Sequence, residues 1–288
     1  MVTYHSAAKI NLLLKVEGRL PDGYHRLVSV MQSVSLFDCL DFDFERRNFS
    51  LHLKNADLDL GSVEKNIITR SWRLMKERFH LPGEVAVTLD KRIPVGAGLA
   101  GGSGNGAAMF HAVNDYFHLG LSLDELAAFG SEIGADVPFC IQGGTMLARG
   151  KGEKLEKLPP LTNTEIVLVN GGFSVSTAEV FRRFDALPPC EETPSLNRMV
   201  EGLVQKTPEL IQSAMYNDLE RVTIPMCPAL AELKERMTSL GLHPLMSGSG
   251  PTVFALIPLD GGVLLRQRWQ DLGGKLYCCS PVNQGVFR

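Results

Sequence analysis

A glycine-dense segment, PVGAGLAGGSG at residues 94–104, is the part of this 288-residue chain whose composition first suggests chemistry. Glycine is required where a backbone takes positive φ or approaches a ligand closely. Directly after the segment, apolar side chains at positions 109, 112, 113, 116 and 117 repeat with helical spacing. A glycine loop that enters a helix presents main-chain N–H groups and the positive end of the helix dipole. The pattern predicts a phosphate-binding loop, with a tight turn that binds nothing as the alternative.

Known nucleotide-binding signatures do not describe this loop. Residues 96–101 fit G-x-G-x-x-G, but the dinucleotide fingerprint needs a strand that runs directly into its first glycine. Here residues 91–94 intervene, and Pro94 cannot donate a ladder hydrogen bond. The G-K-[ST] ending of a Walker loop and the H-R-D and D-F-G motifs of protein kinases are absent from the sequence. A different nucleotide-binding design is therefore expected.

The polar face of the first predicted strand is a second candidate for chemistry. In AKINLLL at residues 8–14, positions 8, 10, 12 and 14 are apolar, whereas Lys9 and Asn11 share the opposite face. The two polar side chains are therefore expected to point the same way. Taken alone, Lys9 could also be an ordinary exposed lysine.

Asp136 lies beyond a separate helix signal. Ser122 followed by Glu125 forms a capping box, and Gly134 can end that helix as a left-handed residue. Residues 135–138 are therefore predicted to be a loop that carries Asp136. On the residues alone, Asp136 could equally cap neighbouring N–H groups.

The elements that must position these residues follow an order typical of an α+β protein. A turn signal at residues 21–23 leaves Tyr24 and His25 at the rim of a hairpin. A charged, proline-bearing stretch at 151–160 indicates a boundary, so two lobes are expected, residues 1–155 and 156–288. The predicted strands span residues 8–14, 26–36, 40–44, 49–53, 85–89, 144–148, 165–169 and 252–257, and predicted helices span 66–79, 109–117, 122–134, 177–184, 195–201, 208–215 and 229–240.

Composition narrows the class of protein. Hydrophobic content of 44% and charged content of 21% are ordinary for a globular chain. The net charge is -3, and Lys and Arg are scattered and form no basic stripe, so we do not expect the chain to bind nucleic acid. We expect no signal peptide, membrane span, disulfide framework or transition-metal site, because none of their sequence patterns is present. The predicted location is cytoplasmic.

Several motifs together resemble the GHMP kinases. They are AKINLLL at 8–14, PVGAGLAGGSGNGAA at 94–108, GADVPF at 134–139 and MSGSGPTVFAL at 246–256, in the family's order over nearly the whole chain. DGYH at 22–25, NIITRS at 66–71 and FSVSTAEVF at 173–181 are similar to the branch of the family that acts on a cytidylated erythritol diphosphate. The resemblance implies an ATP-dependent kinase that phosphorylates the 2-hydroxyl of this substrate. The reaction would belong to the non-mevalonate pathway of isoprenoid precursor biosynthesis.

The resemblance also implies a fold and a set of site residues. The expected fold is a two-lobed GHMP kinase, with an S5-like N-terminal lobe that binds ATP and a ferredoxin-like C-terminal lobe that binds the substrate, as a monomer or weak homodimer. Catalysis is expected from Lys9 and Asp136, cytosine stacking from Tyr24 and Phe181, and base-edge hydrogen bonding from His25. Asn11 and Thr177 are expected near the sugar-phosphate and erythritol groups. ATP is expected at Asn66 and at Pro94, Val95, Gly96, Ala97, Gly98, Leu99, Ala100, Gly101, Gly102, Ser103 and Gly104, with Mg²⁺ held weakly by Ser103.

One stretch departs from the family. Where the family usually reads GGGSSDAA, residues 100–107 read AGGSGNGA, so one hydroxyl and one carboxylate are missing. The residues left for Mg²⁺ are Ser103 and Asn105, and Gly104 and Gly106 are expected to loosen the first helical turn. Two alternatives follow: a GHMP kinase for another alcohol, such as homoserine or mevalonate, and a nucleotide-binding relative that has lost catalysis.

Overall fold

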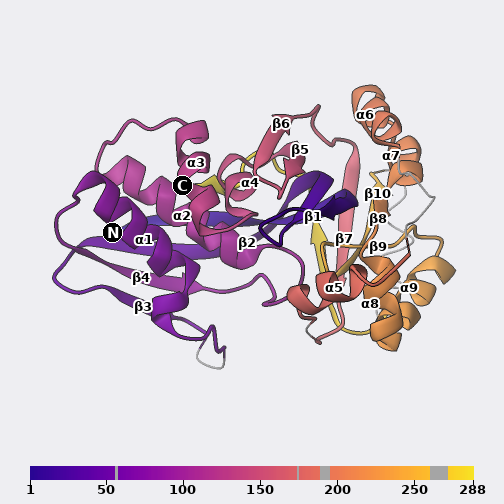
Figure 1. Cartoon of the computed structure of the whole chain (residues 1–288), viewed down its shortest axis with the longest axis horizontal. Coiled ribbons are helices and arrows are strands. Elements are labelled where there is room, and N and C mark those ends of the chain that lie inside the picture. Colours follow the sequence, from indigo (N-terminus) through magenta and orange to yellow (C-terminus); the bar gives the residue numbers. More distant parts are fainter. Residues whose placement is uncertain (56–57, 174, 189–194, 260–271) are drawn as a thin grey trace.

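The computed structural model describes the 288-residue chain apart from residues 56–57, 174, 189–194 and 260–271 (Figure 1). Two sheets lie side by side along the molecule, one covered by the helices of the first half and the other by those of the second. The larger sheet contains β1 (Val2–Arg19), β2 (His25–Arg46), β3 (Ser50–Leu53), β4 (Glu84–Asp90), β5 (Thr145–Gly150), β6 (Lys154–Lys157), β8 (Tyr216–Asn217) and β12 (Val286–Phe287). The smaller contains β7 (Thr164–Asn170), β9 (Leu245–Met246), β10 (Val253–Pro258) and β11 (Lys275–Cys279). The predicted two-lobed α+β architecture is confirmed.

A long antiparallel hairpin, β1 with β2, forms the centre of the larger sheet. Strands predicted separately at 26–36 and 40–44 are one continuous strand, because β2 stays paired with β1 across register shifts. Lys9 lies opposite Ser33 and Asn11 opposite Met31, so both polar side chains do share one face. The hairpin turn falls at residues 20–24, as the PDG signal predicts.

Four helices cover the larger sheet: α1 (Ile67–Phe79), α2 (Gly101–Tyr116), α3 (Leu123–Ile133) and α4 (Val137–Gln142). Trp72 of α1 and Phe110 of α2 pack with Phe42 of β2 in a fully buried core. Gly106 lets α1 and α2 approach, since an added Cβ would lie 2.4 Å from Ile67 Cγ2. That glycine therefore serves close helix packing.

The second half contributes α5 (Thr177–Phe184), α6 (Leu196–Gln205), α7 (Pro208–Ala214), α8 (Glu220–Met226) and α9 (Pro228–Ser239). The helix α8 was not predicted. Leu12 of β1, Leu168 of β7 and Phe254 of β10 belong to one buried cluster, which joins the two sheets. Strands β8 and β12 pair with β1, although both come from the second half of the chain. The division into residues 1–155 and 156–288 therefore stays a prediction.

Three local predictions were wrong. The glycine segment does not remain a loop to residue 104, because α2 begins at Gly101. Gly134 ends α3 with φ of −176°, which is extended and not left-handed. Residues 135–138 are not all loop, since α4 begins at Val137 and holds Pro138 in its first turn. Proline fits there because a first-turn N–H has no intrahelical acceptor to lose.

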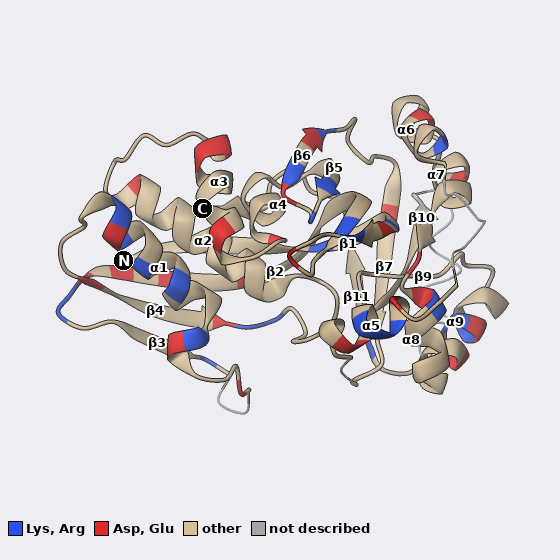
Figure 2. Cartoon of the chain, in the orientation of Figure 1, with Lys and Arg blue, Asp and Glu red and all other residues tan. Residues whose placement is uncertain are grey.

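Charged residues are distributed over both sheets and their helices. In Figure 2, Lys and Arg as well as Asp and Glu appear on elements of both halves. Within the described residues, no helix is long and apolar enough to span a membrane.

Candidate functional site

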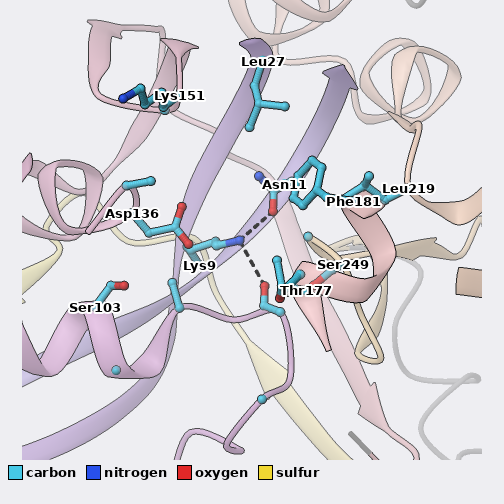
Figure 3. Close-up of a pocket in the computed structure, with 18 of the residues that line it drawn as sticks. Lys9, Asn11, Leu27, Ser103, Asp136, Lys151, Thr177, Phe181, Leu219 and Ser249 are labelled. Atoms are coloured by element: carbon cyan, nitrogen blue, oxygen red, sulfur yellow. Dashed lines mark hydrogen bonds between the residues drawn. The ribbon is translucent and has the colours of Figure 1, made fainter. Parts of the chain in front are cut away.

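A cavity of about 1100 Å³ is lined by residues of both lobes (Figure 3). Its walls come from the β1–β2 hairpin, the glycine segment, the start of α4, the helix α5 and a second glycine loop at residues 246–251. The structure brings together almost every residue that the sequence indicated: Lys9, Asn11, Tyr24, His25, Asn66, Pro94, Val95, Gly96, Ala97, Gly98, Ala100, Gly101, Gly102, Ser103, Asp136, Thr177 and Phe181.

The glycine segment is shaped by positive φ and by one close approach. Gly96, Gly98 and Ala100 have φ of 65°, 73° and 55°. A Cβ on Gly98 would lie 2.1 Å from the carbonyl oxygen of Ser247, so only glycine fits against that second loop. Ala100 precedes α2 without a side-chain cap, and the first helical turn lines the cavity. The free N–H groups of that turn and the helix dipole suit an anionic ligand.

Two residues of the predicted phosphate loop lie outside the cavity lining. Leu99 is buried in the cluster that joins the sheets, and its carbonyl accepts a hydrogen bond from the Lys9 N–H at 3.1 Å. The N–H of Gly104 donates to the carbonyl of Ala100 at 2.9 Å, inside the first turn of α2. These two residues hold the loop in place through main-chain hydrogen bonds and do not line the cavity.

Lys9 projects from β1 into the middle of the cavity. Its side chain is 4% exposed, and Nζ donates to Asn11 Oδ1 at 2.7 Å and to the Gly98 carbonyl at 3.1 Å. Asn11 in turn donates to Ser29 Oγ at 2.9 Å. An ammonium has three donors. The two bonds fix its position and leave one donor for a ligand.

Asp136 is the residue that precedes α4, and it is half-buried at the cavity wall. Its side chain does not cap the helix. Figure 3 shows its carboxylate directed toward Lys9, although no ion pair joins the two. Beneath them lies Cys140, whose pKa is raised well above its usual range by burial and then by the charge of Asp136, with Lys9 opposing. The thiol therefore stays neutral.

Aromatic side chains gather at the far end of the cavity. The rings of His25 and Phe181 stack with centroids 4.6 Å apart and planes at 23°, although one comes from β2 and the other from α5. Tyr24 is 58% exposed, with Lys151 Nζ 4.6 Å from its ring centroid. Lys151 also pairs with Asp22, and that hydrogen bond lowers the pKa of the Asp22 carboxyl.

Thr177 begins α5 and faces the second glycine loop. Its hydroxyl oxygen is 2.7 Å from that of Ser249, and both residues line the cavity. In the same loop, Ser247 Oγ donates to the Gly98 carbonyl at 2.9 Å. The two glycine loops therefore contact each other directly, and this contact ties the lobes together at the cavity.

Beneath the start of α2 lies a buried polar network. Asp38 is fully buried and accepts hydrogen bonds from Lys91 Nζ at 2.6 Å and from Asn105 Nδ2 at 2.8 Å. It also accepts from the main-chain N–H groups of residues 92 and 93. Burial lowers the pKa of Lys91, an effect that Asp38 opposes. Asn105, expected beside a metal, lines the cavity, is 2% exposed and donates its amide nitrogen to Asp38 and to Ser6 Oγ.

Several cavity residues were missed by sequence reasoning. Ser249 could have been found, because it lies in the glycine loop at 246–251 that the sequence already singled out. Lys151, Asp185 and Lys91 belong to none of the motifs that predicted the site. Their relevance depends on partners far away in sequence.

Known proteins similar to this chain agree with one another. Residues 66–144 match the family model described as GHMP kinases N terminal domain, and residues 199–275 match GHMP kinases C terminal. The chain is 41% identical over 250 residues to a 4-diphosphocytidyl-2-C-methyl-D-erythritol kinase of Exiguobacterium sibiricum, covering 86% of each chain. Identity to the enzyme of the same name from Bacillus pumilus is 41% over 257 residues, covering 89% of this chain and 88% of that one.

Solved structures similar to this chain include kinases for the cytidylated erythritol and for other acceptors. The crystal structure of a 4-(cytidine 5'-diphospho)-2C-methyl-D-erythritol kinase superposes with a TM-score of 0.80 at 31% identity, covering 97% of this chain and 99% of that one. A homoserine kinase from Cytophaga hutchinsonii gives 0.74 at 19% identity, covering 99% and 96%. At such low identity, the second likeness concerns the fold alone.

Proposed function

Because this chain belongs to the GHMP kinase family, we propose that it uses ATP to phosphorylate 4-diphosphocytidyl-2-C-methyl-D-erythritol. The chain is an ATP-dependent small-molecule kinase, and its reaction belongs to the non-mevalonate route to isoprenoid precursors. Homoserine and mevalonate kinases share its fold at 12–19% identity, whereas kinases for the cytidylated substrate reach 31–41%. One observation carries the proposal at the level of the site: a single cavity joins the glycine loop, Lys9 with Asp136, and the aromatic end.

We assign the triphosphate of ATP to the glycine segment. Gly101, Gly102 and Ser103 line the cavity at the positive end of a 16-residue helix, where the first N–H groups have no intrahelical acceptor. Asn66 lines the neighbouring wall, where its side chain caps α1 by accepting from the Ile68 N–H at 2.9 Å. The cap leaves the Asn66 amide nitrogen for the nucleotide.

Asp136 and Lys9 are assigned to the acceptor hydroxyl, which the resemblance places at the 2-position of the erythritol. An alcohol is a poor nucleophile at neutral pH, and a carboxylate within reach accepts its proton as phosphoryl transfer proceeds. The Lys9 ammonium stabilises negative charge on the transferring group. Both are held on rigid elements, β1 and the start of α4.

Mg²⁺ would be held mainly by the phosphates of the nucleotide. Ser103 directs its hydroxyl toward the cavity in Figure 3, and Asp136 is the carboxylate labelled beside it. Within the described residues, no group of three His, Cys, Asp or Glu side chains could hold a metal alone. This fits an ion that keeps waters and uses one or two protein oxygens. When bound, the ion neutralises phosphate charge.

The cytidine of the substrate is assigned to the aromatic end. Tyr24 and Phe181 offer ring faces for a flat base, with stacking and burial acting together. His25 follows Tyr24 at the start of β2, and its ring stacks on that of Phe181. Asn11 and Thr177, between Lys9 and the aromatic rings, are assigned to the sugar-phosphate and erythritol groups. We further propose the cytoplasm as its compartment, because both substrates are highly charged and water-soluble.

A phosphorylation assay tests the function. The purified chain is incubated with ATP and excess Mg²⁺ and with the cytidylated erythritol, homoserine or mevalonate in turn, and ADP release and product mass are measured. We expect turnover with the cytidylated erythritol alone. Faster turnover of homoserine or mevalonate would contradict the substrate assignment, and ATP binding without turnover of any of the three would favour a relative that has lost catalysis.

A further inference from the structure

Asp185 holds His25, at the aromatic end of the cavity, through a short hydrogen bond. His25 Nε2 lies 2.6 Å from Asp185 Oδ1, across 160 residues of sequence. The His25 side chain is 10% exposed and that of Asp185 33%, so the bond is partly shielded from water. Arg19 Nη1 approaches the second Asp185 oxygen at 3.7 Å but is largely exposed, which makes it the weaker partner.

The hydrogen bond also fixes the histidine ring. An ionised carboxylate only accepts, so His25 Nε2 must carry the proton of this bond. The ring plane is set a second time by its stacking on Phe181. A side chain with both its plane and one nitrogen constrained has lost its rotational freedom before any ligand arrives.

His25, Phe181 and Asp185, called here the interlobe latch, connect two parts of the molecule. His25 begins β2 in the larger sheet, whereas Phe181 lies on α5 and Asp185 directly follows that helix in helical conformation. Four residues apart, the two face the same way. Val180 anchors α5 in the buried core of the second lobe. The latch therefore sets the position of α5 relative to the β1–β2 hairpin.

We propose that Asp185 is a positioning residue for the substrate base. The inference rests on the proposed function. His25 covers one face of Phe181, so a stacked base has the opposite face, with Tyr24 from the hairpin as the second wall. The interlobe latch determines the distance between Phe181 and Tyr24. Asp185 contributes by fixing the His25 ring against Phe181. Without Asp185, hairpin and helix separate and the gap no longer matches a flat ring.

The test compares Asp185→Ala with Asp185→Asn. Loss of a hydrogen bond to a charged group weakens binding by about tenfold, so Asp185→Ala is expected to raise the KM for the cytidylated substrate about tenfold. Values of kcat and of KM for ATP should stay within about twofold. Asp185→Asn keeps an oxygen that accepts from His25 and should restore most of the lost affinity.

A matched control removes an aspartate that bridges elements elsewhere. Asp41 accepts from Thr3 Oγ1 at 2.7 Å and pairs with Lys54, away from the cavity lining. Asp41→Ala should leave the KM for the cytidylated substrate unchanged. Equal rises in both KM values for Asp185→Ala, or the same rise for Asp41→Ala, would reduce Asp185 to a structural role and overturn the proposal.

Cytidine 5'-diphosphate, titrated without ATP in a calorimeter, separates this proposal from the proposed function. We expect the wild type to bind it and Asp185→Ala to bind about tenfold more weakly. Binding that weakens in this way without any turnover of the erythritol substrate would support the latch and contradict the function. Normal turnover with unchanged binding in Asp185→Ala would support the function and overturn the latch.

Discussion

The two ends of the cavity are built in different ways. At the proposed phosphate end, the cavity wall offers main-chain N–H groups, and its supporting contacts are buried or partly buried: Gly98 against Ser247, and Asp38 beneath α2 with Lys91 and Asn105. At the aromatic end, the ligand meets side chains that are held by partly exposed pairs, Lys151 on Tyr24 and Asp185 on His25.

Solved kinases with different named acceptors match this fold over nearly the whole chain at 12–19% identity. A main-chain site depends on backbone conformation and therefore persists through side-chain change, whereas a side-chain site changes with a few substitutions. The phosphate end should accordingly fail through altered packing, and the aromatic end through loss of single groups.

The largest effect is expected where the two ends meet. Asp136→Asn removes the proton acceptor while keeping shape, so kcat should fall by about 10³-fold, within the range for general-base loss. The KM for ATP should change by less than about twofold, because Asp136 is proposed to act on the acceptor side. Steady-state kinetics with each substrate varied in turn measure both. Unchanged kcat would remove Asp136 from the chemistry.

Breaking the buried network should damage the phosphate end through stability. Asp38→Ala leaves Lys91 buried without its carboxylate, and such a loss costs about 3–5 kcal/mol. Urea unfolding should show this loss. The matched control is Glu132→Ala, which removes the acidic partner of an exposed pair with Arg78 and should cost far less. Similar losses for the two variants would mean that the network has no special role.

A methyl group at Gly98 should disturb the contact between the two glycine loops. In Gly98→Ala, the added methyl group collides with Ser247, so the KM for ATP should rise about tenfold. The positive φ alone should lower the free energy of unfolding by ~1 kcal/mol. Gly120 has a similar φ of 68° and nothing within 4 Å of an added Cβ. Gly120→Ala should therefore show the φ penalty and normal ATP kinetics. Equal ATP effects would disprove the packing explanation.

The smallest effect is expected at the exposed aromatic wall. Tyr24→Ala removes a stacking face, worth about 1–3 kcal/mol per base, and its exposure favours the lower end of that range. We expect the KM for the cytidylated substrate to rise about fivefold, with the KM for ATP unchanged. Tyr24→Phe keeps the ring and should behave as wild type. A loss in Tyr24→Phe equal to that in Tyr24→Ala would point to the hydroxyl and not to stacking.

The expectation for Gly106 shows where local reasoning stops. Glycine inside a helix lowers helix propensity, so a looser first turn of α2 was a reasonable prediction. In the fold, Ile67 of α1 occupies the space where a Cβ would stand. Glycine at this position lowers helix propensity but lets α1 and α2 pack closely. The neighbouring sequence shows the loss of propensity and not the packing.

Short-range patterns determined much of this protein by themselves. The capping box at Ser122, the shared face of Lys9 and Asn11, the turn before Tyr24 and the helix at residues 177–184 all follow from spacing and backbone preferences within a few residues. The motifs, in their order along the chain, identified the family. The capping box, the shared strand face, the turn and the helix are local signals, and the structure contains each of them.

Only the tertiary structure decided which distant residues meet. Gly98 contacts Ser247, Asp38 accepts from Lys91, and Asp185 binds His25 because sheet register and helix packing bring them together. Isolated charges such as Asp185 look alike in sequence, since their energy depends on burial and on partners more than 50 residues away. Those long-range contacts shape both ends of the cavity.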